Sequence, residues 1–177
     1  MRPARSFEAC PSSNWSHARA TIQEAMVDSL TPAQRSERMS RIRSSNTKPE
    51  IYLRKALHRL GFRFRLHGRK LPGKPDIILP KHKAVVFVHG CFWHRHASCR
   101  VASVPKSNTE FWLAKFARNV ERDAVVRQKL QDEGWRVFVT WECETDSPKK
   151  AELAAKELAC LLLNGTTEFS VQDVSSV

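Results

Sequence analysis

The chain has 177 residues, enough for one domain with a sizeable core but few for two. It carries 30 Lys and Arg against 18 Asp and Glu, a formal net charge of +12 and a pI near 10.0, which favours a polyanionic partner such as nucleic acid. No run approaches the ~18 apolar residues of a membrane span. An odd cysteine count of five, without a signal-like apolar run, argues against a disulfide framework.

The chain starts with a segment that shows no clear hydrophobic period. Residues 1–30 mix Arg, Ser, Ala and Pro, and we expect them to form a poorly ordered extension. Their Arg and Ser content loosely resembles that of a transit peptide. The alternative is that the start of the chain is misassigned, because Met26 lies close to the organised region. Thr31-Pro32 is typical of an N-cap with proline at the first helical position, which predicts a basic helix through Arg43.

A second helix is predicted from a capping-box pattern. Thr47 and Glu50 have the required spacing, and the helix should end at Gly61. Its apolar face comprises Leu53, Ala56, Leu57 and Leu60. As a capping-box carboxylate, Glu50 needs no catalytic role.

Three short strands are predicted next. Residues 62–66 alternate apolar and basic side chains, as a half-buried strand does. The loop 67–75 is rich in Gly, Lys and Arg, which suits either phosphate contact or plain solvation. Residues 77–79 and 84–88 are apolar, largely β-branched and bounded by Gly and Pro, so they predict a hairpin with its turn at 80–83.

This hairpin should bring a carboxylate to a strand end. Asp76 opens the first strand, and Val88 and His89 close its antiparallel partner, so we expect the three residues to lie close together. A carboxylate beside a strand-end carbonyl is a hard-oxygen site suited to Mg²⁺. Asp76 could instead be a turn residue after Pro75, but the imidazoles and thiols beyond Val88 favour the metal site.

A cluster of thiols and imidazoles follows the hairpin. Three potential ligands have the spacing C-x4-H-x2-C, and a fourth ends a later strand-like run. These groups are Cys91, His96, Cys99 and Cys143. They predict a tetrahedral structural Zn²⁺, with buried free cysteines and ordinary loop histidines as the alternative. If zinc takes these four, His89 and His94 remain for acid–base chemistry, and His94 is the candidate general base.

The C-terminal half is predicted to form a helix, a strand and a second helix. A capping box at 107–110 begins a helix to about residue 133, with Phe116, Val120 and Ala124 at helical spacing. Residues 135–141 are partly apolar on both faces, which predicts an interior strand. Ser147-Pro148 begins a last helix that should end near residues 164–165. Together with the earlier elements, this order predicts an α/β fold with a mixed central sheet flanked by helices.

Five sequence blocks together resemble one protein family, the very-short-patch-repair DNA mismatch endonucleases. They are L-P-G-K-P-D-I-I at 71–78, F-V-H-G-C-F-W-H at 87–94, T-E-F-W-L-A-K at 109–115, N-V-E-R-D at 119–123 and G-W-R-V-F-V-T-W-E-C at 134–143. Their order along one chain makes the resemblance specific, and it covers roughly residues 31–143. It implies a restriction-endonuclease-like fold. We expect the endonuclease domain to span residues 31–165, followed by a loose tail at 166–177.

The resemblance also implies roles for individual residues. Nucleases of this fold commonly carry an acid-x-Lys pair where this chain has Phe87-Val88-His89, and the family likewise has His in place of Lys. The family often has Thr where this chain has Val88, and a backbone carbonyl at that position can still bind Mg²⁺. Glu50 matches an active-site glutamate near the metal water.

DNA contacts are implied in the same way. Met39 matches a residue that wedges into the duplex beside the mispair, and Lys115 and Asn119 match residues that read the mispaired bases. Phe92 and Trp93 match an intercalating pair, which would open a mismatch more easily than a paired step. Without the resemblance, these five side chains would be read as a helix anchor, a solvated helix face and core aromatics packed beside Trp135 or Trp141.

We therefore predict a Mg²⁺-dependent endonuclease that nicks one strand 5′ of the thymine in a T:G mispair left by deamination of 5-methylcytosine. Asp76 and Val88 hold Mg²⁺, His94 activates water, and His89 and Glu50 assist. The expected partner is double-stranded DNA, with a functional link to a cytosine-5 methyltransferase, and we expect a monomer in the bacterial cytoplasm at the nucleoid. The alternatives are a restriction-type nuclease that cuts both strands and a non-catalytic zinc-containing DNA-binding module.

Overall fold

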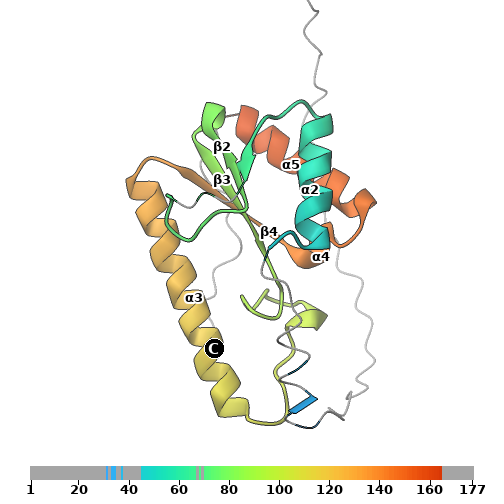
Figure 1. Ribbon diagram of the computed structural model, residues 1–177, viewed down its shortest axis with the longest axis vertical. Coiled ribbons are helices and arrows are strands. Elements are labelled where there is room, and N and C mark those ends of the chain that lie inside the picture. The colour runs from blue at the N-terminus through green and yellow to red at the C-terminus, as the bar shows by residue number, and fades with distance from the viewer. Residues whose placement is uncertain are drawn as a thin grey trace, which may run out of the picture.

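The structure is a computed structural model, shown in Figure 1, and it describes residues 31, 33–34, 37, 45–66, 68 and 70–164. Most of the first predicted helix, Met39 included, lies outside these residues. Its predicted N-cap is confirmed, because the Thr31 N–H donates to Gln34 Oε1 (2.9 Å) and the Gln34 N–H donates to Thr31 Oγ1 (3.3 Å).

The elements follow the predicted order, with one added short helix. The longer helices are α2 (Lys48–Arg59), α3 (Thr109–Asp132) and α5 (Pro148–Leu163), and the short α4 spans Glu142–Thr145. The strands are β1 (Arg65–Leu66), β2 (Ile77–Leu79), β3 (Ala84–His89) and β4 (Arg136–Trp141). Two 3₁₀ turns lie at Pro80–His82 and Arg100–Ala102.

One mixed sheet connects these strands in the order β1-β2-β3-β4. β2 and β3 form the predicted antiparallel hairpin, with Ile78 opposite Val85, and Lys83 in its turn has a φ of 47°. β4 runs parallel to β3, with Val85 opposite Val137. The prediction of an interior strand was wrong, because β4 lies at the edge of the described sheet. The predicted strand at 62–66 is also shorter, since only Arg65 and Leu66 pair with β2.

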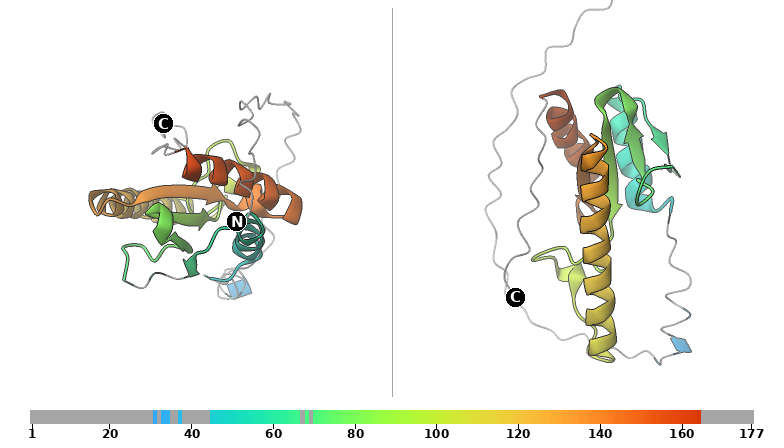
Figure 2. Two further views of the ribbon diagram at one scale, coloured as in Figure 1. Left: turned by 90° about the horizontal axis from the view of Figure 1, so that it is seen from above. Right: turned by 90° about the vertical axis from the view of Figure 1, so that its left-hand side faces the viewer.

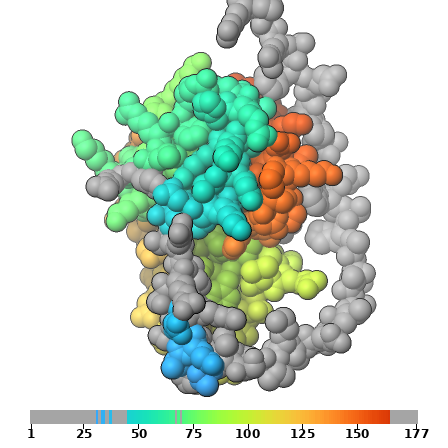
Figure 3. Space-filling model, turned by 45° about the vertical axis from the view of Figure 1, so that its right-hand side comes forward, coloured from blue at the N-terminus to red at the C-terminus, as the bar shows by residue number. Residues whose placement is uncertain are grey.

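Helices cover both faces of the sheet (Figure 2), and they explain why β4 is apolar on both sides. On one face, Phe138 and Val86 pack against Leu57 of α2 and Leu158 of α5 in the larger core cluster. Figure 3 shows α2 and α5 side by side on the surface. On the other face Leu130 of α3 packs with Val85 and its neighbours. An edge strand between two helical layers is therefore buried on both faces without neighbouring strands on both sides.

Helix α3 is much longer than the strands beneath it. Its 24 residues span about 36 Å at 1.5 Å per residue, whereas the six residues of β4 span about 20 Å. The N-terminal half therefore projects beyond the sheet (Figure 1), where it meets the segment after β3. Trp112 and Phe116 are buried in that half, and Leu130 is buried in the other.

Helix boundaries confirm most of the predictions and correct one. Glu50 accepts from the Thr47 N–H (3.3 Å) at the start of α2, as the capping box predicts. At α3 the N-cap is Asn108, with a φ of 51° and no side-chain cap, so the predicted box at 107–110 does not form. The Thr109 hydroxyl donates backwards to the carbonyls of Pro105 and Lys106 instead. None of the helices among the described residues is long and apolar enough to span a membrane.

Candidate active site and metal cluster

Asp76 and Val88 meet where the hairpin opens, as predicted. The Val88 N–H donates to Asp76 Oδ2 at 2.8 Å, so the Asp76 side chain takes the place of a ladder partner just beyond the last β2–β3 pair. In an extended strand the N–H and C=O of one residue point to the same side. The Val88 carbonyl therefore faces the Asp76 side of β3. One carboxylate and one backbone carbonyl match the oxygen donors that Mg²⁺ takes in proteins.

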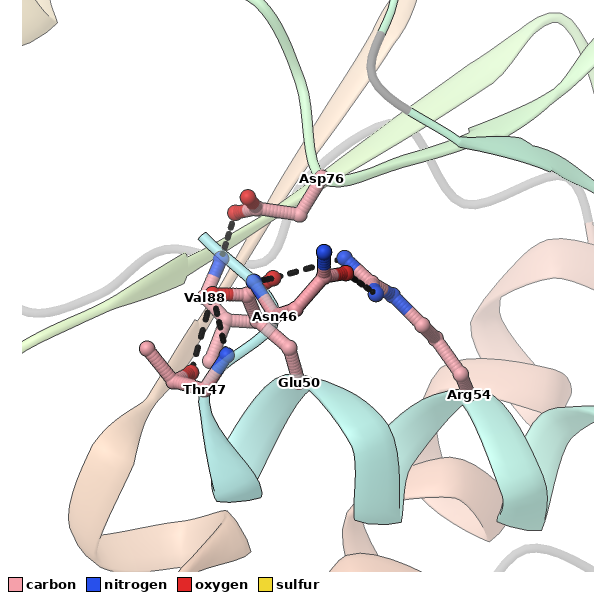
Figure 4. A network of polar contacts seen from close by, with 6 residues as sticks. All are labelled: Asn46, Thr47, Glu50, Arg54, Asp76 and Val88. Atoms are coloured by element: carbon pink, nitrogen blue, oxygen red, sulfur yellow. Dashed lines mark hydrogen bonds and ion pairs between the residues drawn. The ribbon is translucent and has the colours of Figure 1, made fainter. Parts of the chain in front are cut away.

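Glu50 lies beside this pair although it belongs to α2. Figure 4 shows the Asp76 and Glu50 side chains approaching Val88, one from the start of β2 and one from the first turn of α2. The Glu50 residue is 3% exposed, and both of its carboxylate oxygens are hydrogen-bonded. Oε1 accepts from the N–H and the hydroxyl of Thr47 at 3.3 and 2.8 Å. Oε2 accepts from the Asn46 N–H (2.9 Å) and from the Arg54 guanidinium (2.6 Å).

The two predicted acid–base histidines contact each other at the end of β3, and one of them adjoins the Asp76–Val88 pair. His89 follows Val88 directly, and its ring stacks on that of His94 with centroids 3.9 Å apart and planes 14° apart. His94 Nδ1 makes a very short contact with Asp123 Oδ2 from the middle of α3. A carboxylate on Nδ1 fixes the imidazole tautomer with its proton on that atom, which leaves Nε2 able to accept a proton.

The environment of His89 differs from that of His94. Burial, reinforced by the neighbouring His94, lowers the pKa of His89 to about 3, and the Asp123 carboxylate only partly offsets this. His89 is therefore neutral at physiological pH. It is poorly suited to proton transfer near pH 7, and its stacking contact instead supports the face of His94.

Four predicted zinc ligands come together on the other side of Trp141. The ligand atoms of Cys91, His96, Cys99 and Cys143 all lie within 4.8 Å of one another. His96 Nδ1 is 3.5 Å from Cys91 Sγ and 3.3 Å from Cys143 Sγ. Tetrahedral zinc, with bonds of about 2.3 Å to sulfur and 2.0 Å to nitrogen, places such atoms about 3.5 Å apart. The donor set and its spacing therefore fit Zn²⁺.

The ionisation of this cluster depends on whether a cation is bound. Burial raises the pKa values of the Cys91 and Cys143 thiols, and adjacent thiols raise that of Cys143 further. Burial lowers the pKa of His96, which keeps its imidazole neutral, as a metal ligand must be. Without a cation the thiols remain protonated; a bound divalent ion would stabilise them as thiolates.

The two aromatic residues between these groups pack on the projecting half of α3. The Phe92 ring makes edge-to-face contacts with Trp93 and with Phe116, both at 5.0 Å between centroids. Both Phe92 and Trp93 are only partly buried. Their ring contacts are with Trp112 and Phe116, whereas the alternative of core packing had placed them beside Trp135 or Trp141.

Lys115 and Asn119 also meet this segment. The Lys115 ammonium lies 5.3 Å from the centroid of the Trp93 ring, within cation–π range. Asn119 Nδ2 donates to the Trp93 carbonyl at 3.0 Å. The predicted base-reading residues and the predicted intercalating pair thus form one continuous surface.

Two residues of this site were missed from the sequence, and both left a signal. Asp123 lies four residues after Asn119 on α3, where it interrupts the inward face between Phe116 and Leu130. A charged carboxylate at a position that helical spacing assigns to the apolar face is unusual, and this could have identified Asp123 as a site residue. Arg54 lies four residues after Glu50, which is the spacing of an ion pair on a helix.

Comparison with known proteins shows the family to which the chain belongs. The family model described as DNA mismatch endonuclease Vsr matches residues 27–100. The chain is 49% identical over 119 residues to the Type II nicking enzyme V.XorIIP of Xanthomonas oryzae pv. oryzae, covering 67% of this chain and 87% of that protein. It is 50% identical over 119 residues to the Type II nicking enzyme V.NmeAIP of Neisseria meningitidis serogroup A, covering 67% and 84%.

A third relative carries the family name itself. The chain is 43% identical over 118 residues to the DNA mismatch endonuclease Vsr of Escherichia coli strain K12, covering 67% of this chain and 75% of that protein. These relatives and the site at the end of β3 define a DNA endonuclease. The chain belongs to the DNA mismatch endonuclease Vsr family.

Proposed function

We propose that the protein is a strand-specific mismatch endonuclease that nicks 5′ of the thymine in T:G mispairs left by deamination of 5-methylcytosine. Family membership supports the reaction, and the formal charge of +12 supports the duplex as substrate. The observation that carries the proposal is the chain of contacts from the Asp76–Val88 hydrogen bond, through His89, which stacks on His94, to the His94–Asp123 pair. This arrangement places oxygen donors for a metal beside a base for water.

Proton transfer falls to His94. Asp123 holds the Nδ1 proton, so His94 Nε2 takes a proton from a water as its oxygen attacks the phosphorus. The bond from phosphorus to the 3′ oxygen of the preceding nucleotide breaks, and that oxygen leaves to be protonated from solvent. The products carry a 3′ hydroxyl and a 5′ phosphate at the thymine. His89 supports the His94 ring by stacking.

Asp76 and the Val88 carbonyl are the residues that hold Mg²⁺. When bound, Mg²⁺ supplies charge neutralisation at the phosphate and the leaving oxygen. Glu50 lies beside them, and its four acceptor positions are occupied by protein donors. It accepts a hydrogen bond from water when the Thr47 hydroxyl, which can rotate without disturbing the backbone, turns away.

The closed group of Cys91, His96, Cys99 and Cys143 is proposed as a structural Zn²⁺ site. All four positions of a tetrahedral ion are filled by protein, so none remains for substrate. A bound ion would link the segment after β3, which carries Cys91, His96 and Cys99, to Cys143 of α4. The architecture around both sites fits a restriction-endonuclease-like fold, in which residues 31–165 form the catalytic domain.

DNA recognition is proposed for the aromatic surface on α3. Phe92 and Trp93 enter the base stack at the mispair, where unstacking costs least, and they are already half-exposed. Lys115 and Asn119 lie against Trp93 and read the bases there. Met39 completes the wedge in this proposal. The protein acts as a monomer in the bacterial cytoplasm, at the nucleoid, in step with a cytosine-5 methyltransferase that creates the lesion.

The test compares strand-labelled duplexes that differ only in one pair, T:G or C:G, with Mg²⁺ present. We expect one nick, 5′ of the mispaired thymine, and no product from C:G. Asp76→Ala should be inactive, while Asp132→Ala, an exposed acid of α3 bonded only within its own helix, should retain activity. Equal cutting of both duplexes would contradict the mismatch proposal, and an active Asp76→Ala would contradict the metal site.

A supercoiled plasmid substrate separates the alternatives. A restriction-type nuclease would linearise the plasmid, whereas a nickase would relax it. A non-catalytic binding module would bind the duplex tightly without any Mg²⁺-dependent product.

A further inference from the structure

Arg54 is a buried cation beneath the proposed active site. It lies on α2 one turn after Glu50, and the residue is 8% exposed. One guanidinium nitrogen donates to Glu50 Oε2 at 2.6 Å and another donates to Asn46 Oδ1 at 2.7 Å. Nε has no hydrogen-bond partner within the described part of the chain. Figure 4 shows Arg54 one turn further along α2 than Glu50, with its guanidinium reaching back toward Asn46 and Glu50.

The Arg54 contacts determine how the Glu50 carboxylate is held. Oε1 is fixed by Thr47 at the helix start, but Oε2 depends on the Asn46 N–H and on Arg54. Asn46 has a φ of 55°, in the left-handed region, and its side chain is itself held by Arg54. Arg54 therefore fixes both the carboxylate and the turn that supplies its second donor.

Stability alone does not account for a cation in this position. Burying a guanidinium and a carboxylate removes both from water, and replacing such a pair with apolar side chains is often neutral or stabilising. The unsatisfied Nε adds to the cost of burial. Arg54 is also too deeply buried to contact a DNA phosphate. What the pair does supply is a carboxylate in one fixed orientation beside Asp76 and Val88.

We propose that Arg54 is a positioning residue for strand nicking, which holds the Glu50 carboxylate in its orientation at the metal end of β3. This inference rests on the proposed function. Arg54 acts only through Glu50, so its loss should lower the rate of the chemical step and leave DNA binding unchanged. Loss of a residue that orients a metal-site ligand or its neighbour typically costs about 10- to 100-fold in activity.

The experiment uses Arg54→Gln, which keeps neutral donors, and Arg54→Lys, which keeps the charge and can replace one of the two hydrogen bonds. Single-turnover nicking of the T:G duplex is measured against DNA concentration, and thermal unfolding is followed in parallel. The matched control is Arg59→Gln on the same helix. Arg59 is exposed and pairs with Glu152 of α5, so its loss should leave nicking unchanged.

We expect the maximal rate of Arg54→Gln to fall about 10-fold or more, with the half-saturating DNA concentration within about twofold of wild type, because Arg54 does not contact phosphate. The maximal rate of Arg54→Lys should lie between the rates of the wild type and of Arg54→Gln. In a Glu50→Gln background, adding Arg54→Gln should cause no further loss, because the residue acts through Glu50 alone.

Three results would overturn the proposal. One is a folded Arg54→Gln that nicks at the wild-type rate, and another is full additivity with Glu50→Gln. The third is a fall in thermal stability with unchanged activity per folded molecule, which would make Arg54 purely structural. If the wild-type protein itself failed to nick T:G duplexes, the proposed function would fall, and this inference with it.

Discussion

Two side-chain clusters lie at the end of β3, and they differ in how completely the protein fills them. The closed cluster, Cys91, His96, Cys99 and Cys143, offers four sulfur and nitrogen donors to one ion. The open site, Asp76, Val88, His89, His94 and Asp123, offers oxygen donors and imidazoles without enclosing an ion. Trp141 contacts both, with its ring stacked on His96 and edge-on to His89.

The difference shows how one short segment serves two purposes. A closed set of ligands fixes chain positions and leaves no place for substrate. An open set leaves room for water and phosphate, which nicking requires. Residues 91–99 contribute to both clusters, so the closed cluster holds in place the loop that carries His94 and the two aromatic rings. Breaking either cluster should therefore give a different kind of defect.

The largest effect should come from opening the closed cluster. Cys143→Ser removes the ligand that links the 91–99 segment to α4, and zinc binding free energy in such sites is folding free energy. We expect loss of bound zinc and a fall of about 10 °C in the unfolding midpoint. Metal analysis would measure the zinc content and a thermal melt the unfolding midpoint. Glu142→Gln, at an exposed position beside Cys143, is the control. A variant with full zinc content and a wild-type melt would show that the cluster is not structural.

Next in size is the loss of the carboxylate from the open site. Asp123→Asn can keep a hydrogen bond to His94 but no longer selects the tautomer with a free Nε2, so nicking should slow by about 100-fold or more. The unfolding midpoint should change little. Glu121→Gln, an exposed neighbour on α3, provides the control in the same single-turnover assay. Wild-type rates in Asp123→Asn would exclude His94 as the base.

The aromatic pair between the clusters should give an intermediate effect. Trp93→Ala removes one stacking surface, worth about 1–3 kcal/mol per base, so T:G binding should weaken roughly 10-fold or more. Binding to a C:G duplex should change less, which narrows the preference for the mispair. Leu113→Ala truncates an apolar side chain of α3 that is 50% exposed and serves as the control in a fluorescence titration. Equal weakening on both duplexes would argue against intercalation at the mispair.

The smallest effect concerns acid stability. The pKa of His89 is lowered to about 3 in the folded protein, whereas an unfolded chain has the usual 6.5. Below pH 6.5 the unfolded state therefore binds a proton that the folded state does not, so acid favours unfolding down to about pH 3. The stability of the wild type should fall more steeply from pH 7 to pH 5 than that of His89→Gln, by at most about 1.4 kcal/mol per pH unit.

Denaturant melts of the two proteins at matched pH would measure this difference. Comparing them at each pH cancels the acid sensitivity of the closed cluster, which both share. Parallel stability curves would show that His89 is not buried as a neutral ring.

Local patterns predicted the hairpin and both helix starts at Thr47 and Ser147 because each depends on residues only a few positions apart. The Ser147 hydroxyl accepts from the Lys150 N–H, and the strands of the hairpin pair in the expected register. Three of the four closed-cluster ligands, Cys91, His96 and Cys99, also lie only a few positions apart, so their spacing predicted them. Asp76 was predictable because a two-stranded hairpin brings its ends together by geometry alone.

Other features depend on how distant elements pack. His94 and Asp123 are 29 positions apart in the sequence, with the whole approach to α3 between them, so only the docking of that helix joins the two side chains. The position of β4 at the sheet edge was missed because two helical layers can bury a strand as fully as flanking strands do. The packing of Phe92 on Phe116 likewise follows from the overhang of α3.

The sequence by itself determined the chemical groups of this protein and their local arrangement, because capping, turn formation and strand alternation act over a few residues. The tertiary structure decided which of those groups meet. Arg54 reaches Glu50 within one helix, but the Glu50 carboxylate reaches the end of β3 only because α2 docks on the sheet there. Contacts of that kind depend on the packing of whole faces, and no short stretch of sequence encodes them.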